Sequence, residues 1–172
     1  MCGFVGFTNF VDNSNQVLEN MMNKIIHRGP DSGGTYIDES IALGFRRLSI
    51  IDLAQGDQPI LNEDGSKVLL FNGEIYNYQG IREKLVQAGH KFRTKTDSEV
   101  LLHGYEEYGK DLLNMLRGMS AFVIWDKNTK ELFGARDFFG IKPLYYSLSG
   151  ESFLFGSEIK SFLPHPHFKK VL

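Results

Sequence analysis

The chain begins with the stretch Met1-Cys2-Gly3-Phe4-Val5-Gly6, which contains the only cysteine among its 172 residues. Removal of Met1 would place a thiol and a free α-amine on one residue. A free α-amine has a pKa of roughly 7.7 to 8.0 and a free thiol one of about 8.5, so a proton can pass between them near neutral pH. Cys2 would then be a nucleophile that carries its own base. The alternative is that a cysteine after the first methionine is an accident of the start site.

The composition is typical of one globular domain with a buried core, at 42% hydrophobic and 23% charged residues. A net charge of -2, a pI near 6.2 and the scatter of lysines and arginines argue against a nucleic-acid partner. No apolar run approaches the roughly 18 residues that span a membrane, and no secretory signal is present. The single cysteine favours a reducing cytoplasm. The five histidines show no ligand spacing, so we expect no metal site.

Hydrophobic periodicity and turn residues predict an alternation of strands and helices. The expected strands cover residues 4–8, 35–37, 41–45, 67–71, 90–93, 121–125, 131–136, 144–146 and 153–155. The expected helices cover residues 17–26 after a cap at Ser14 or Asn15, 78–86, and 96–109 after a cap at Thr96 or Asp97, with a short turn at 112–116. Strands that are apolar on both faces, together with few amphipathic helices, indicate two sheets packed face to face with helices outside.

Asn72 and Gly73 follow the expected strand 67–71 and precede the expected helix 78–86. Asn-Gly usually marks a hairpin turn, but here no second strand follows directly. An Asn amide and a Gly backbone N–H at a strand end can also be two donors to an oxyanion, each contributing on the order of 3 kcal/mol to a transition state. The pair is therefore a candidate for stabilising the tetrahedral intermediate of amide hydrolysis.

Arg47 lies in the apolar run 45–51, so we expect at least one of Arg46 and Arg47 to be partly buried and to require an anion. That anion could be an internal carboxylate or the carboxylate of a substrate, and the sequence leaves both open. Asp97 precedes a helical pattern, where an aspartate is commonly a cap. Together with Arg47 and Glu74, it could also provide the charges that bind the two ends of a free amino acid.

The chain resembles the glutaminase domain of glutamine-hydrolysing asparagine synthetase, a class II glutamine amidotransferase, over residues 2 to about 163. The resemblance rests on Met1-Cys2-Gly3, Arg28-Gly29-Pro30-Asp31, Arg47-Leu48-Ser49-Ile50, Asn72-Gly73-Glu74-Ile75-Tyr76-Asn77, Thr96-Asp97-Ser98-Glu99, Arg136-Asp137 and Gly140-Ile141-Lys142-Pro143-Leu144-Tyr145-Tyr146. It implies an α+β fold, the four-layer αββα sandwich of the N-terminal nucleophile hydrolases. It also implies a glutaminase domain at 1–163, followed at 164–172 by the start of a linker to a C-terminal synthetase domain that this chain lacks.

The same resemblance assigns roles to individual residues. Cys2 would be the nucleophile, and Asn72 with Gly73 would form the oxyanion hole. The glutamine-binding residues would be Arg47 for the α-carboxylate and Glu74 and Asp97 for the α-ammonium, with Asn72 and the backbone of Ile50 beside them. No metal ligand is implied in this domain.

The expected reaction is hydrolysis of L-glutamine to glutamate and ammonia through a γ-glutamyl thioester on Cys2. The ammonia would pass to a C-terminal domain that uses ATP and magnesium to convert aspartate to asparagine, while the glutaminase domain itself needs no cofactor. Three alternatives remain: the glutaminase half of an amidotransferase acting on a sugar or peptide, a related hydrolase of larger acyl groups, and a catalytically idle interaction module. The first includes the glucosamine-phosphate and phosphoribosylamine amidotransferases. A homodimer is possible.

Overall fold

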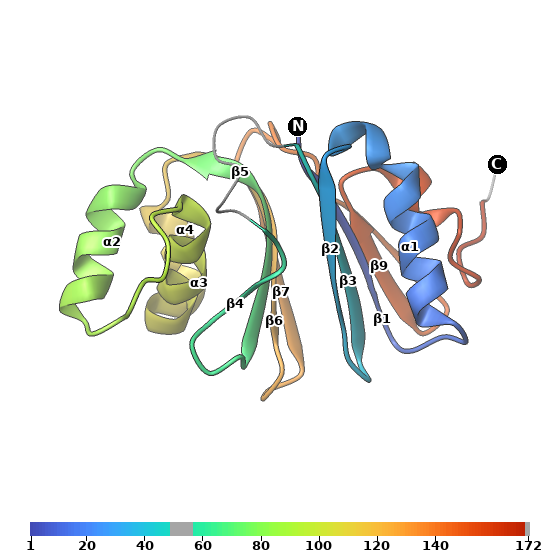
Figure 1. Ribbon diagram of the computed structural model, residues 1–172, viewed down its shortest axis with the longest axis horizontal. Coiled ribbons are helices and arrows are strands. Elements are labelled where there is room, and N and C mark those ends of the chain that lie inside the picture. The colour runs from blue at the N-terminus through green and yellow to red at the C-terminus, as the bar shows by residue number, and fades with distance from the viewer. Residues whose placement is uncertain (49–56, 171–172) are drawn as a thin grey trace. The chain divides into compact units, whose positions relative to one another are not determined.

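The computed structural model describes residues 1–48 and 57–170, which form two compact units. The first unit comprises the described residues 1–48, 57–59 and 143–170, and the second comprises residues 60–142. Each unit contains one antiparallel sheet with helices packed on it (Figure 1). Ile50, one of the expected glutamine-binding residues, lies outside the described residues.

The sheet of the first unit has the order β2-β3-β1-β9-β8, and every neighbouring pair is antiparallel. Its strands are β1 (Gly3–Thr8), β2 (Ser32–Ile37), β3 (Ile41–Arg47), β8 (Tyr145–Ser149) and β9 (Ser152–Gly156). Helix α1 (Ser14–Lys24) covers one face, and two short 3-10 helices, η1 (Ile26–Arg28) and η3 (Ile159–Phe162), complete the unit. Strand β1 is therefore central, with β3 and β9 on its two sides.

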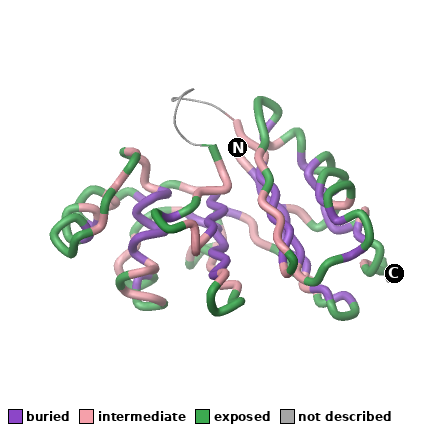
Figure 2. The backbone as a smooth tube through the Cα atoms, turned by 60° about the horizontal axis from the view of Figure 1, so that its bottom comes forward, coloured by how far each residue is buried: buried purple, intermediate pink, exposed green. Residues whose placement is uncertain are grey.

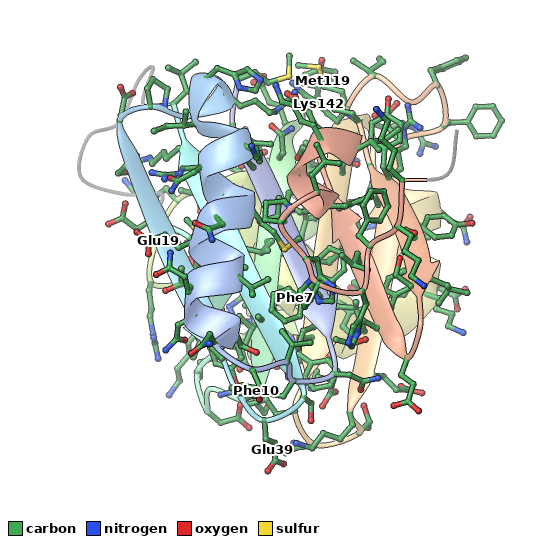
Figure 3. All side chains as sticks on the ribbon, turned by 90° about the vertical axis from the view of Figure 1, so that its right-hand side faces the viewer. Phe7, Phe10, Glu19, Glu39, Met119 and Lys142 are labelled. Atoms are coloured by element: carbon green, nitrogen blue, oxygen red, sulfur yellow. The ribbon has the colours of Figure 1, made fainter. Side chains whose placement is uncertain are left out.

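The core of the first unit lies between α1 and this sheet. Phe7 of β1 and Leu18 and Met21 of α1 are almost completely buried in one apolar cluster. Figure 3 shows buried Phe7 and exposed Glu19 on opposite sides of α1, which matches the polar and apolar faces of the helix. The apolar positions of the sequence thus indicated the buried face of α1 correctly.

The sheet of the second unit has the order β4-β5-β6-β7. Its strands are β4 (Ile60–Leu61), β5 (Lys67–Ile75), β6 (Gly118–Asp126) and β7 (Glu131–Arg136), and its helices are α2 (Tyr78–Gln87), α3 (Asp97–Tyr108), the 3-10 turn η2 (Gly109–Asp111) and α4 (Leu112–Met115). Leu101 and Leu102 of α3 pack on the sheet, and α2 packs on α3 through Ile81 and Leu85. Figure 2 shows the buried segments along the sheet strands and α3.

Most expected elements are present, but four details of the sequence-based prediction were wrong. Strand β5 does not stop before Asn72, because β6 pairs with it as far as Ile75. Residues 90–93 form no strand, and the Glu99 carboxylate accepts the backbone N–H groups of Arg93 and Thr94 instead. Helix α1 begins at Ser14, whose hydroxyl bonds to the backbone of Val11 rather than capping the helix. The two-residue strand β4 was not predicted.

The segment after Leu163 packs on the first unit. His165 is buried, with its ring centroid 4.8 Å from that of Phe7. Phe168 makes an edge-to-face contact with Phe162 at 5.7 Å. The chain therefore stays attached to this unit as far as Phe168, beyond the position at which we expected a linker to begin. The expected domain boundary itself stays a prediction.

Candidate active site

Cys2 lies immediately before the central strand of the first unit. The β1–β3 register pairs Gly3 with Arg46, which brings Cys2 to the end of β3, where Leu48 follows the strand. The backbone N–H of Leu48 donates to Cys2 Sγ at 3.4 Å, and the thiol faces the Leu48 carbonyl at 3.7 Å. The half-buried thiol is thus held by backbone groups at the end of two paired strands.

Arg28 holds the main chain of Cys2 from the other side. Its Nε donates to the Cys2 carbonyl at 3.0 Å, and its Nη1 donates to Glu158 at 3.2 Å. A side chain on Gly3 would lie 2.9 Å from the Arg28 side chain, so only glycine leaves room for this contact. Burial by itself raises the pKa of Glu158, but hydrogen bonds from neighbouring basic side chains outweigh it and lower the pKa. An ionised Glu158 therefore keeps Arg28 in place.

Arg47 ends β3 and is largely buried, with 11% of its side chain exposed. This confirms the expected partial burial. Its Nη1 lies 3.1 Å from Oδ1 of Asp57, whose side chain is 89% exposed. The structure thus provides an internal carboxylate partner, one of the two alternatives. Because Asp57 is exposed, another carboxylate could replace it at small cost.

The Arg28-Gly29-Pro30-Asp31 loop positions this end of β3. A Cβ on Gly29 would lie only 2.3 Å from the carbonyl carbon of Arg46 and 2.4 Å from the nitrogen of Arg47. The N–H of Asp31 donates to the Arg47 carbonyl at 3.2 Å. The glycine therefore allows the loop to lie directly against the strand that carries Arg47.

Asn72 and Gly73 lie within β5, paired with Ala121 and Ser120 of β6. Asn72 is only 4% exposed, and its Nδ2 has no hydrogen-bond acceptor among residues 1–48 and 57–170. Buried polar groups are nearly always hydrogen-bonded, so an unpartnered amide donor is an exception that requires an explanation. An acceptor from a ligand would provide one.

Glu74 and Asp97 lie close together where β5 meets α3. The N–H of Ile75 donates to Asp97 Oδ2 at 2.8 Å, so this carboxylate joins the start of α3 to the strand. Burial raises the pKa of Asp97, and the charge of exposed Glu74 raises it further, although backbone N–H groups oppose both. Two neighbouring carboxylates whose charges repel would gain from a bound cation.

The motif residues near the end of β7 have a structural role. Arg136 donates to the carbonyls of Gly140 and Lys142 at 2.7 and 3.0 Å. Asp137 accepts the N–H groups of Ile141 and Lys142 at 2.8 and 2.9 Å, and its Oδ2 lies 3.3 Å from the nitrogen of Ser120. These contacts fix the loop after β7 against β6, at the residue paired with Gly73.

The expected site residues divide between the two units. Cys2 and Arg47 belong to the first, and the second contains Asn72, Gly73, Glu74 and Asp97. Within the second unit the structure brings these four residues to one end of β5. Sequence reasoning did not identify the role of Arg28, although an arginine directly before Gly-Pro in a loop could have suggested an anchoring side chain.

A comparison with known protein families identifies the class of protein to which the chain belongs. The sequence model of the family described as "Glutamine amidotransferase domain" matches residues 1–172, so the chain belongs to the glutamine amidotransferases. It is 48% identical over 168 residues to asparagine synthetase [glutamine-hydrolyzing] 1 of Bacillus subtilis (strain 168), covering 95% of this chain and 27% of that protein. Asparagine synthetase [glutamine-hydrolyzing] 2 of Arabidopsis thaliana is 44% identical over 167 residues, which cover 94% and 28%. The chain thus spans about a quarter of the length of these relatives.

Two solved structures share the fold. One is the glutamine phosphoribosylpyrophosphate amidotransferase from B. subtilis complexed with ADP and GMP, with a TM-score of 0.78 and 24% identity over 94% of this chain and 43% of that chain. The other, titled the allosteric regulatory enzyme of purine biosynthesis, has a TM-score of 0.79 and 24% identity over 95% and 43%. They confirm the predicted α+β fold class. Over the described part of the chain, no helix is long and apolar enough to cross a bilayer.

Proposed function

We propose that this domain hydrolyses L-glutamine through a γ-glutamyl thioester on Cys2, and that its ammonia serves a C-terminal synthetase domain that converts aspartate to asparagine. Membership of the glutamine amidotransferases and the similarity to asparagine synthetases support this function. The observation that carries the chemistry is the buried Nδ2 of Asn72, which has no acceptor within the described residues. An amide donor of this kind suits the oxyanion of a tetrahedral intermediate.

The first half-reaction requires a free α-amine on Cys2, and therefore removal of Met1. The Cys2 thiol transfers its proton to this amine, and the thiolate attacks the side-chain amide carbon of glutamine. The oxyanion that forms accepts hydrogen bonds from Asn72 Nδ2 and the Gly73 N–H. The α-ammonium then returns the proton to the leaving nitrogen, the carbon–nitrogen bond breaks, and ammonia and the thioester result.

The second half-reaction reverses the proton path. The α-amine accepts a proton from water, whose oxygen attacks the thioester carbon at the same oxyanion hole. The carbon–sulfur bond then breaks, the proton passes to the Cys2 sulfur, and glutamate leaves. Arg28 contributes by holding the Cys2 carbonyl, so that the thiol and the amine keep a fixed position during both steps.

Recognition of glutamine uses charges at both ends of the amino acid. In this proposal the substrate α-carboxylate replaces exposed Asp57 at the guanidinium of Arg47, which can bind it through two hydrogen bonds. Glu74 and Asp97 bind the α-ammonium, which relieves the repulsion between them. Asn72 and the backbone of Ile50 complete the substrate site.

The rest of the proposal concerns the longer protein. Its synthetase domain would bind ATP and magnesium, and this domain would work without a cofactor or metal in its glutaminase site. We propose a cytoplasmic location for the protein, with a homodimer as one possible oligomeric state.

The test compares the full-length protein with its Cys2→Ala variant. The variant should release no ammonia from glutamine and should not be labelled by a glutamine analogue that carries an electrophile in place of the amide. It should still make asparagine from aspartate, ATP and added ammonium, which shows that the variant is folded. Retained glutamine turnover would contradict the nucleophile assignment, and normal turnover with a sugar or peptide acceptor would contradict the assignment to asparagine synthesis.

A further inference from the structure

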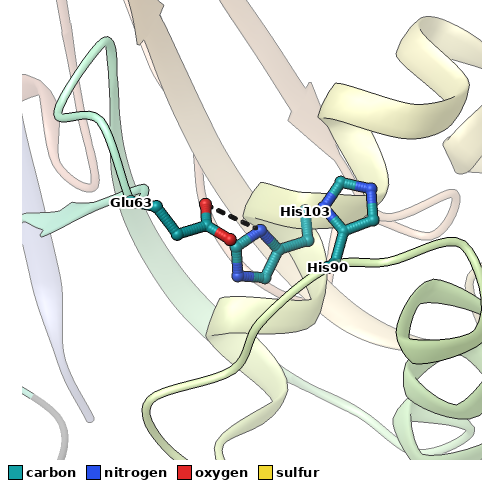
Figure 4. Close-up of side chains that lie close together, drawn as sticks. All are labelled: Glu63, His90 and His103. Carbon is teal, nitrogen blue, oxygen red and sulfur yellow. Dashed lines mark ion pairs between the residues drawn. The ribbon is translucent and has the colours of Figure 1, made fainter.

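A second group of reactive side chains lies in the unit formed by residues 60–142. Glu63 lies between β4 and β5, His90 follows α2, and His103 lies in α3. One possible ligand atom from each of these residues lies within 4.8 Å of the others, as the close-up shows (Figure 4). Three segments that are distant in sequence therefore bring two imidazoles and a carboxylate together.

The distances within this cluster are close to those around a bound metal ion. Oε2 of Glu63 lies 3.6 Å from Nδ1 of His103, and Oε2 of Glu106 is hydrogen-bonded to the same nitrogen at 2.9 Å, a contact that a bound ion would replace. Nδ1 of His90 lies 4.0 Å from that Glu106 oxygen. Ligand atoms of a tetrahedral zinc site, with bonds of about 2.0–2.1 Å, lie about 3.3 Å apart. Glu106 is therefore a natural fourth donor.

Neighbouring groups hold the donors in orientation. Asn62 Nδ2 donates to Oε1 of Glu106 at 2.6 Å, which leaves Oε2 facing the histidines. Behind His103, Oε1 of Glu99 lies 3.7 Å from Nε2, and Glu99 is itself fixed by two backbone N–H groups at 2.7 Å. A carboxylate on the side of the second nitrogen is a common feature around metal-binding histidines, and Glu99 is placed there without a direct hydrogen bond to Nε2.

The charge of the cluster also favours a cation. Only 2% of the His103 side chain is exposed, and the carboxylates of Glu63, Glu99 and Glu106 surround it. Three carboxylates around one buried imidazole favour a bound cation, and one of them, Glu63, is exposed.

We propose that Glu63, His90, His103 and Glu106 bind one divalent metal ion of the zinc type. Two imidazole nitrogens and two carboxylate oxygens form a donor set that suits zinc. The ion would join the β4–β5 turn and the end of α2 to helix α3. This site lies outside the glutamine chemistry, and it departs from our expectation from histidine spacing, because the ligands come from separate segments.

The test is a calorimetric titration of chelator-treated protein with zinc chloride. It uses the Cys2→Ala background, because the only thiol is itself a potential zinc ligand. We expect one zinc ion per chain, and His90→Gln and Glu63→Gln should each weaken binding by roughly tenfold or more. These residues are partly exposed, so both variants should fold. His167→Gln and Glu83→Gln, which change exposed residues outside the cluster, should bind zinc as tightly as the parent.

Two further readouts identify the site. Zinc should raise the melting temperature of the parent but not of His90→Gln, because a ligand stabilises the state that binds it. Cobalt should give the visible absorption of a four-coordinate ion in the parent and in both controls, and lose it in Glu63→Gln. Absence of stoichiometric binding, or zinc affinity that His90→Gln leaves unchanged, would overturn the proposal. The contact of His103 with Glu106 would then be a structural hydrogen bond.

Discussion

Among single residues, Asn72 combines deep burial with an unpartnered donor. If this donor binds the oxyanion, Asn72→Ala should lower kcat for glutamine hydrolysis by roughly 10²- to 10³-fold with a small change in KM. Because Nδ2 makes no hydrogen bond within the described residues, the free energy of unfolding should change by only about 1 kcal/mol. Steady-state kinetics and urea unfolding measure the two effects.

Asn62→Ala is the matched control. Asn62 is equally buried, but its side chain donates to Ser66 and Glu106 and accepts the N–H of Lys67. Its removal should destabilise the fold by about 1–3 kcal/mol and leave kcat unchanged. A loss of stability without a loss of kcat in Asn72→Ala would show that Asn72 is a structural residue.

Arg47 and Asp97 should determine the affinity for glutamine. Arg47→Lys should raise KM at least severalfold, because an ammonium cannot replace a two-point contact with a carboxylate. Asp97→Asn should raise KM by removing the charge that pairs with the substrate ammonium, while its amide oxygen can still accept the N–H of Ile75. Asp57→Asn changes the exposed partner of Arg47 and should leave KM close to normal. A normal KM in Arg47→Lys and Asp97→Asn would show that neither residue binds glutamine. Arg47 would then form only an internal ion pair with Asp57, and Asp97 would only connect α3 to β5.

For single residues, the sequence indicated which side chains would be buried or charged better than it indicated which residues they would contact. An arginine in an apolar run indicated the burial of Arg47, but nothing in the pattern indicated that Asp57 would face it. The cluster of Glu63, His90 and His103 had no local signal at all, because it depends on how three segments pack. Contacts between separate segments follow from the fold and not from spacing along the chain.

At the scale of elements, β5 shows how tertiary pairing overrides a local signal. Asn72-Gly73 is a turn sequence, yet β6 continues to pair with β5 as far as Ile75. A Cβ on Gly73 would lie 2.2 Å from the carbonyl oxygen of Met119, so the glycine serves close strand packing there rather than a turn. The donor expected at the end of a strand is therefore held inside one, which restricts its motion.

The loop at Gly29 provides a test at the same scale. Gly29→Ala would place a Cβ within 2.5 Å of the Arg46 and Arg47 backbone, so we expect a loss of about 1–3 kcal/mol of stability and a raised KM as Arg47 shifts. Gly80→Ala is the control, because nothing lies within 4 Å of its Cβ in helix α2. That variant should gain about 0.5–1 kcal/mol. Equal stability of the two variants would contradict the proposed role of Gly29.

At the scale of the whole molecule, the sequence indicated two sheets with outer helices but not the order of the strands. Each of the two sheets is present with its helices, and the fold shared with the two solved structures agrees with the predicted α+β class. The central position of β1 between β3 and β9 could not be predicted, since β9 pairs with it from the far end of the chain. The pairing of β1 with β3 places Cys2 beside Leu48, so the position of Cys2 depends on contacts between separate segments that local patterns do not show.

The central claim is that Cys2 acts as the first residue of the mature chain. Met1 turns the α-amine into an amide nitrogen without basicity, and general base catalysis alone contributes roughly 10²- to 10⁴-fold. The most direct measurement is intact-mass spectrometry of protein that has reacted with the electrophilic glutamine analogue, followed by location of the label. We expect one label per chain, on Cys2, and only on chains that have lost Met1. Labelling and full turnover by chains that still carry Met1, or a label on another residue, would contradict the claim that Cys2 acts as the first residue.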